Sequence, residues 1–381
     1  ARSLGVDVLE LVKPSDAELM NAMNTAAARQ ALVDQAVLDG TLDTVLANLL
    51  AELQNDPTVA EVGLSDAGRG LWIVDENGIP SAIYAPEDAV KSGASGTTAA
   101  PGAPLLSDRK PALVPTIPGV DRHVDWKPYD LFHPAPKSAA GGTGPLAMSA
   151  ATAGENVIES NKVLGIAAQY WDWGEGDDIP KMVKTLQDDE CFEVTYTRYD
   201  SEGSGDVDDF KNMGNYGIVL ISSHGDSFYA QAAAGDRFGW SNQSSGIVVL
   251  HSNQTINLAN LKTHLKDVLA GRLILWGDMY GMTPTFMTTY SGKMPNSLVY
   301  MSICRGTFNA TLANAYLGAG AGAFLGYSDY VAVAFCETNG PPLLDTLLEA
   351  DMTLDDAFMP GLIETDADPA EFKLFGSKTL R

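Results

Sequence analysis

A histidine and a cysteine each follow a short apolar run in this chain. The run 216–221 leads to His224, the run 297–301 leads to Cys304, and a glycine follows each reactive residue within two positions. Such runs fill sheets that are buried on both faces. If they are neighbouring parallel strands, their carboxyl ends meet at one edge, where open α/β folds place their sites. An imidazole near a thiol can take its proton, and the resulting thiolate attacks carbonyl carbons.

Either residue alone has an ordinary structural explanation. A lone cysteine in an apolar strand is usually a small core side chain, and a lone histidine is usually a hydrogen-bonded polar group. The case for chemistry therefore depends on the pair and on the segments around it.

The order strand–His–Gly, intervening segment, strand–Cys, helix, strand resembles that of the caspase-like (clan CD) cysteine peptidases, which include caspases, legumain, clostripain and gingipains. A small-residue helix expected at 309–318 and an Ala/Gly-rich strand at 320–326 are similar to those that follow the nucleophile in gingipain-like members. The end of the chain, 372–380, loosely resembles their closing segment. The resemblance covers residues 157–381 and is nearest to the gingipain/clostripain type.

This resemblance implies a cysteine endopeptidase that acts on a protein or peptide substrate. Cys304 would attack the scissile carbonyl, His224 would protonate the leaving amine, and a thioester would then be hydrolysed. The backbone N–H groups of Gly225 and Cys304 would be the oxyanion donors. No cofactor is required. The pair is expected to act as a dyad, with Asp226 equally suited to a turn.

The resemblance also bears on the substrate pocket. Several relatives that cut after Arg or Lys carry an acidic residue two positions before the nucleophile, where this chain has Ser302. A basic preference is therefore in doubt. Asp329, just past the strand end at 326–328, could restore it or could simply cap a loop. Asp278 is a weaker candidate for the same role.

Composition limits the classes of function. The chain has 381 residues, 45% of them hydrophobic, which is enough for two domains or for one large domain with an appendage. A formal net charge of -25 makes nucleic acid and anionic membranes poor partners. Cys191, Cys304 and Cys336 have no metal-type spacing, and pairing of Cys191 with Cys336 stays open. No apolar run of about 18 residues predicts a membrane span.

Two further expectations concern calcium and location. The acidic loops 175–178 and 200–208 could hold calcium, which prefers oxygen ligands. Neither loop follows the EF-hand spacing, and acidic loops are usually solvated. Because the chain begins at Ala1, we expect a removed signal peptide or a trimmed sequence, and favour a secreted or periplasmic bacterial protein.

The chain divides into three predicted parts. Residues 1–88 form a small α+β N-terminal region that could serve as a prodomain, with a Ser15–Glu18 capping pair, a helix at 42–53 and a hairpin at Asn77-Gly78.

Residues 89–155 are a flexible Gly/Pro/Ala-rich linker, in which Arg109-Lys110 and Arg122 are candidate processing sites of a zymogen. The resemblance implies that residues 156–381 form a caspase-like peptidase domain, an α/β three-layer sandwich, and the βαβαβ order predicts a mostly parallel central sheet.

Two other classes compete with an enzyme. A catalytically silent caspase-like module would keep the sheet and serve binding or regulation. A flavodoxin-like receiver or ligand-binding domain ranks third, because the sequence has no glycine-rich phosphate loop and no acidic cluster at strand ends.

Overall fold

The computed structural model describes residues 14–65, 68–85, 156–233, 235–240, 245–349, 352–364 and 369–381. All of these belong to one compact unit. The predicted linker, with Arg109, Lys110 and Arg122, lies outside the described residues.

The N-terminal part is a helical pair followed by three strands. Its elements are α2 (Asp16–Leu38), α3 (Leu42–Leu53), β1 (Val59–Leu64), β2 (Gly70–Asp75) and β3 (Pro80–Tyr84). The predicted capping box is confirmed, since the side chains of Ser15 and Glu18 each accept from the other's backbone N–H. The predicted hairpin is also confirmed: β2 and β3 pair antiparallel, and Gly78 in their turn has a φ of 76°.

A six-stranded sheet carries the two apolar runs. Its strand order is β13-β12-β11-β6-β4-β5, in which β13 is antiparallel to β12 and each other adjacent pair is parallel. The strands are β4 (Lys162–Ala167), β5 (Glu193–Arg198), β6 (Ile218–Ser222), β11 (Leu298–Ser302), β12 (Ala323–Tyr327) and β13 (Phe372–Gly376). All five residues of β6, β11 and β12 are buried, as expected for strands covered on both faces.

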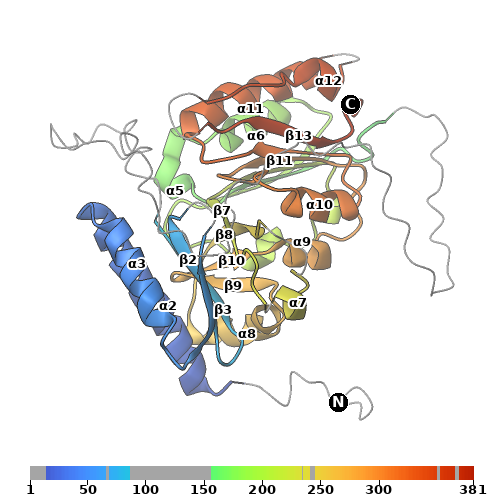
Figure 1. The fold of residues 1–381 in the computed structure, drawn as a ribbon. Coiled ribbons are helices and arrows are strands. Elements are labelled where there is room, and N and C mark those ends of the chain that lie inside the picture. Colours follow the sequence, from blue (N-terminus) through green and yellow to red (C-terminus); the bar gives the residue numbers. More distant parts are fainter. Residues whose placement is uncertain are drawn as a thin grey trace, which may run out of the picture. The chain divides into compact units, whose positions relative to one another are not determined.

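Helices pack on both faces of this sheet (Figure 1). One face is covered by α6 (Ile179–Asp188), α11 (Val333–Leu347) and α12 (Leu354–Ala357), whose apolar residues share a core cluster with Leu298 and Leu325. The other face packs against α9 (Pro284–Tyr290) and α10 (Thr311–Gly318), in a second cluster with Val299 and Phe324. Alternate residues of one strand therefore enter opposite cores.

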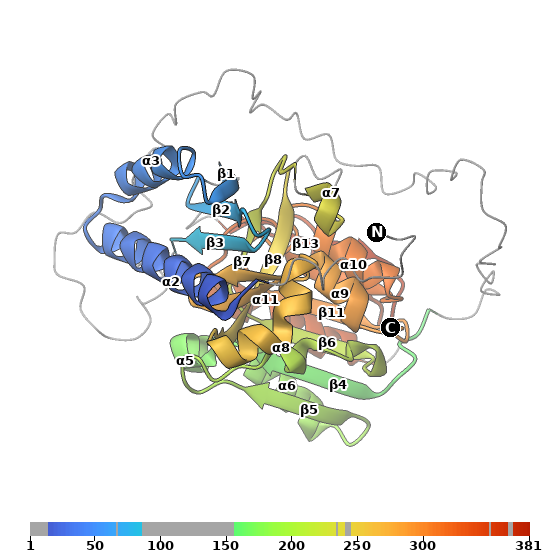
Figure 2. The same ribbon diagram turned by 90° about the horizontal axis from the view of Figure 1, so that it is seen from below.

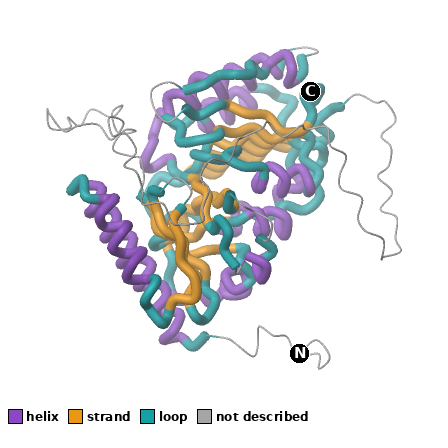
Figure 3. Tube along the Cα trace, in the orientation of Figure 1, coloured by secondary structure: helices purple, strands orange, loops and turns teal. Residues whose placement is uncertain are grey.

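A seven-stranded sheet, which the sequence does not predict, forms the second group of strands in Figure 3. Its order is β1-β2-β3-β9-β10-β8-β7, with a single parallel pair, β3 and β9. The remaining strands are β7 (Gly225–Phe228), β8 (Ile247–Thr255), β9 (Leu273–Trp276) and β10 (Met279–Met282). The segment predicted as a separate region, 1–88, thus shares a sheet with residues 225–282.

Shorter elements complete the connections. They are the helices α5 (Tyr170–Trp173), α7 (Gly235–Phe238) and α8 (Leu258–Leu269) and the 3-10 turns η4 (Gly174–Gly176), η5 (Val207–Phe210) and η6 (Met213–Asn215). The general expectation of an α/β fold is confirmed, with two mixed sheets. Among the described helices, none combines the length and the apolar character needed to cross a bilayer.

Candidate active site

His224 and Cys304 follow adjacent strands at the same offset. Strands β6 and β11 pair in parallel with Ser222 opposite Ser302, and each reactive residue lies two positions beyond its member of that pair. The N–H of Ser223 donates to the carbonyl of Ser302 at 3.3 Å, which extends the pairing past the strand ends. Both residues therefore leave the sheet at one edge.

Gly225 brings the two backbones together. A Cβ built on this residue would lie 2.6 Å from the carbonyl oxygen of Cys304, so only glycine allows the observed approach. Gly225 is also the first residue of β7, in the other sheet. The chain thus passes from one sheet to the other at His224.

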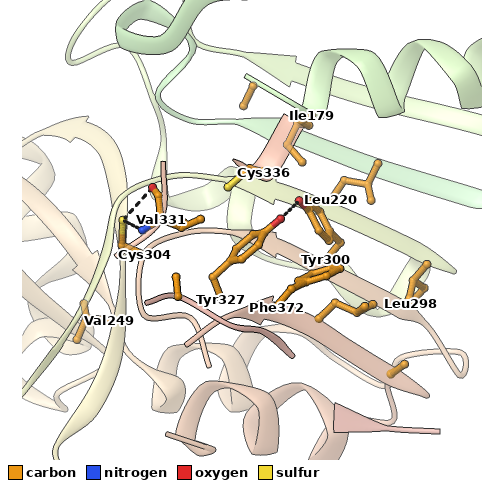
Figure 4. Close-up of a cluster of buried hydrophobic side chains, with 14 of the residues drawn as sticks. Ile179, Leu220, Val249, Leu298, Tyr300, Cys304, Tyr327, Val331, Cys336 and Phe372 are labelled. Carbon is orange, nitrogen blue, oxygen red and sulfur yellow. Dashed lines mark hydrogen bonds between the residues drawn. The ribbon is translucent and has the colours of Figure 1, made fainter. Parts of the chain in front are cut away.

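Cys304 is buried, with 3% of its surface exposed. Its Sγ accepts a hydrogen bond from the N–H of Val331 at 3.5 Å, and the thiol lies 3.8 Å from the carbonyl oxygen of the same residue (Figure 4). Val331 follows β12 by a few residues. The segment between β12 and α11 therefore covers the thiol in this state.

His224 has a carboxylate beside its imidazole. Nε2 lies 3.8 Å from Oδ2 of Asp172, and 15% of the histidine side chain is exposed. The ring of Trp173 meets the imidazole edge-on with 5.3 Å between centroids. Asp172 and Trp173 belong to α5, which follows β4.

His251 is a second histidine at this edge. Its ring centroid lies 6.0 Å from that of His224, and its backbone N–H donates to the carbonyl of His224 at 3.0 Å. Burial, followed by the charge of His224, lowers the pKa of His251 to about 3. The ring is therefore neutral, and its Nδ1 lies 3.1 Å from Nε2 of Gln169, a donor. Nothing in the sequence pairs His251 with β6, so its place at this edge is known from the structure alone.

A small cavity adjoins the thiol. Its volume is about 10 Å³, the lower limit for one water molecule. The lining residues are Trp173, Asp178, Ser223, Ser302, Cys304, Val331, Val333 and Cys336. The candidate pocket residue Ser302 thus lies beside Cys304.

The other candidate pocket acids do not line this cavity. Asp329 lies with its Oδ1 3.8 Å from Nε of Arg305 and accepts from the N–H of Tyr330 at 3.0 Å. Asp278 lies in the turn between β9 and β10, in the seven-stranded sheet.

The carboxyl group that does line the cavity is Asp178, which was expected in a solvated acidic loop. That expectation is wrong for Asp177 and Asp178, which are each 1% exposed. The hydroxyl of Ser222 donates to Asp177 at 2.7 Å, and that of Tyr300 donates to Asp178 at 2.5 Å. Burial raises the pKa of both carboxyls, and with the neighbouring charge of Asp178 that of Asp177 reaches about 7.

A buried ion pair links the two candidate catalytic segments. Nη1 of Arg305, the residue after Cys304, lies 2.9 Å from Oδ1 of Asp226, two residues after His224. The two side chains are 2% and 0% exposed. Burial is the largest single influence and disfavours the guanidinium, but the charge and hydrogen bond of Asp226, together with Tyr330 and Asp329, outweigh it, so the pKa of Arg305 is raised. Asp226, left open as a turn residue, thus has a structural partner.

Arg305 also has a φ of 56°, in the left-handed region that non-glycine residues rarely adopt. Its guanidinium lies over the ring of Phe308, 3.6 Å from the centroid. The contacts of the Arg305 side chain with Asp226 and Phe308 therefore stabilise the sharp turn after Cys304.

No disulfide joins the three cysteines, so the pairing of Cys191 with Cys336 is not formed; Cys191 is exposed and Cys336 is buried. The described residues contain no group of three or more His, Cys, Asp or Glu side chains placed to hold a metal ion.

No protein-family model and no curated protein matches the chain. What the site does must therefore be argued from its geometry.

Proposed function

We propose that the chain is a cysteine endopeptidase of the caspase-like type, with Cys304 as nucleophile and His224 as its acid–base partner. The supporting observation is the register of β6 and β11, because the Ser222–Ser302 pair puts both residues at the same offset beyond adjacent strand ends. We also propose that the protein is nearest to the gingipain/clostripain type and that its six-stranded sheet corresponds to the central sheet of that family.

The proposed reaction proceeds in two steps. The Cys304 thiol gives its proton to His224, the sulfur bonds to the scissile carbonyl carbon, and the C–N bond breaks as the imidazolium protonates the leaving amine. Water then hydrolyses the thioester, with His224 as base, and the thiol is regenerated. N–H groups of Gly225 and Cys304 would stabilise the oxyanion.

Asp172 has a positioning role in this proposal. Its carboxylate lies 3.8 Å from Nε2 of His224 and would favour the imidazolium that forms when the thiol ionises. The neutral ring of His251 and the edge of Trp173 restrict where the imidazole can move.

Neither step uses a cofactor. Calcium in the loop 200–208 stays a proposal in which backbone carbonyl oxygens would supply ligands, because no three acidic side chains of this loop, which the structure describes in full, are placed to hold a metal ion. In the loop 175–178 two of the carboxyls are already hydrogen-bonded to Ser222 and Tyr300.

The structure would be a latent form of this enzyme. Cys304 is 3% exposed, and the cavity beside it holds no more than about one water molecule. A peptide could reach the sulfur only if the segment around Val331 and Val333 moved. A zymogen fits this state if its activation moves that segment, a step that cleavage of the chain between its folded parts would not by itself bring about.

Hydrolysis of a mixed peptide library tests the proposal. We expect cleavage by the activated wild type and loss of cleavage in Cys304→Ala and His224→Ala treated in the same way. Matched controls are Cys336→Ser, which alters the same cavity, and the exposed Cys191→Ser. Cleavage that survives in Cys304→Ala would refute the assignment of the nucleophile.

The second candidate is a catalytically silent caspase-like module, and the burial of Cys304 favours it. Such a module would show no hydrolysis under any activating treatment, including limited proteolysis within 89–155. It would still keep the Asp226–Arg305 pair, which serves the fold alone.

A further inference from the structure

The N-terminal region, residues 14–65 and 68–85, is bound to the rest of the unit by backbone pairing. Strand β3 pairs in parallel with β9, with Ser81 opposite Leu275 and Ala82 opposite Trp276. The N–H of Gly277 donates to the carbonyl of Ala82 at 3.0 Å. β3 is thus an internal strand of the seven-stranded sheet, and without it β9 would become an open edge.

Apolar and aromatic side chains seal the same boundary. Trp72 of β2 lies 5.5 Å from the ring of Tyr229, whose hydroxyl donates to the carbonyl of Ser81 at 2.8 Å. On α2, Leu19 and Ala26 are buried in one cluster with the apolar face of α8. Figure 2 shows α2 running beside β3. These are the properties of an obligate interface, which resembles a divided core.

The end of β3 reaches the segment that covers the candidate nucleophile. The ring of Tyr84 is stacked on that of Tyr330 at 6.4 Å, and the guanidinium of Arg69 lies 4.5 Å from the Tyr330 centroid. Tyr330 directly precedes Val331, the residue whose N–H donates to the Cys304 thiol. Tyr84 and Arg69 of the N-terminal region therefore contact Tyr330, the neighbour of the residue that covers the Cys304 thiol.

We propose that the N-terminal region is a permanent part of the folded protein rather than a removable prodomain. When the chain is cut anywhere within 89–155, the two pieces remain bound to each other, and the smaller piece keeps the Tyr330–Val331 segment over Cys304. The strand that pairs with β9 after cutting is thus still β3 of the same protein. The proposal does not depend on Cys304 being catalytic.

The test uses the full chain with a recognition sequence for a specific protease inserted after Gly96 or, in a second version, after Gly142. Complete cutting is verified on a denaturing gel before native size-exclusion chromatography. We expect the pieces to elute together at the position of the uncut protein and to separate only in denaturant. Separate elution under native conditions would overturn the proposal.

A second measurement tests the contact with Tyr330. In a background of Cys191→Ser and Cys336→Ser, the rate of alkylation of Cys304 by iodoacetamide is followed. We expect cutting to leave the rate unchanged and Tyr84→Ala to raise it several-fold. The control is Leu38→Ala, an α2 substitution at a side chain that is 80% exposed. Equal rates for Tyr84→Ala and Leu38→Ala, with both proteins folded by circular dichroism, would contradict the proposed role of the N-terminal region.

Discussion

Replacement of Arg305 by methionine should destabilise the protein strongly. The substitution keeps an unbranched apolar stem but leaves the carboxylate of Asp226, which is 0% exposed, without the guanidinium 2.9 Å away. Loss of one partner from a buried ion pair costs about 3–5 kcal/mol, because the other charge stays buried without compensation. A typical protein has a free energy of unfolding of about 5–15 kcal/mol, so this loss is a large part of the total.

The double variant Asp226→Asn/Arg305→Met separates the ion pair from the packing around it. Because no isolated charge is then buried, we expect it to lose less stability than Arg305→Met alone, which gives a coupling energy between the two positions. The measurement is guanidinium chloride unfolding followed by circular dichroism at constant pH.

The exposed pair Lys184–Asp188 provides a matched control. Its side chains are 72% and 66% exposed, so Lys184→Met should change the unfolding free energy by no more than about 0.5 kcal/mol. If Arg305→Met falls within the same range, or if the double variant is as unstable as Arg305→Met, the ion pair does not hold the two segments together as we argue.

Three further predictions concern the same edge of the sheet. Gly225→Ala places a Cβ 2.6 Å from the Cys304 carbonyl oxygen, so we expect a loss of about 1–3 kcal/mol in denaturant unfolding; an unchanged midpoint would show that the backbones can separate freely. The pKa of Asp177 is raised to about 7, so the folded state binds its proton more tightly than the unfolded state, and stability falls as the pH rises from about 4 to 7. Asp177→Asn should reduce this fall, which unfolding at about pH 4.5 and pH 8 measures, and equal falls would refute the assignment. The pKa of His251 is lowered to about 3, so the stability it contributes is present above pH 6.5 and is lost as the pH falls toward 3. His251→Gln should therefore lose less stability in acid than the wild type, and an identical acid profile would contradict a buried neutral ring.

Local patterns in the sequence predict the elements well. The capping pair at Ser15, the turn at Gly78 and the apolar runs before His224 and Cys304 depend on neighbours within a few residues, and each of these elements is present. The same runs, taken with their order, also led to the candidate residues.

Long-range partners could not be predicted in this way. Asp177 and Asp178 lie among glycine and acidic residues, a composition that indicates a solvated loop. Their carboxyls are instead buried against hydroxyl donors that are distant in the sequence: Ser222 is 45 residues from Asp177, and Tyr300 is 122 residues from Asp178. The pairing of β3 with β9 could not be predicted either, because the sequence of a short buried strand is compatible with many neighbouring strands. The position of His251 beside His224 could not be predicted, because it depends on how β8 of the seven-stranded sheet meets the end of β6 in the six-stranded sheet.

The most direct test of the proposed activity is labelling with peptidyl acyloxymethyl ketones of varied P1 residue, followed by peptide mapping. We expect a thioether on Cys304, formed as the carboxylate leaves, with none on Cys336 or Cys191 and none at all in Cys304→Ala. Activated wild-type protein that binds no probe at Cys304, or that is labelled equally at the other two cysteines, would contradict it.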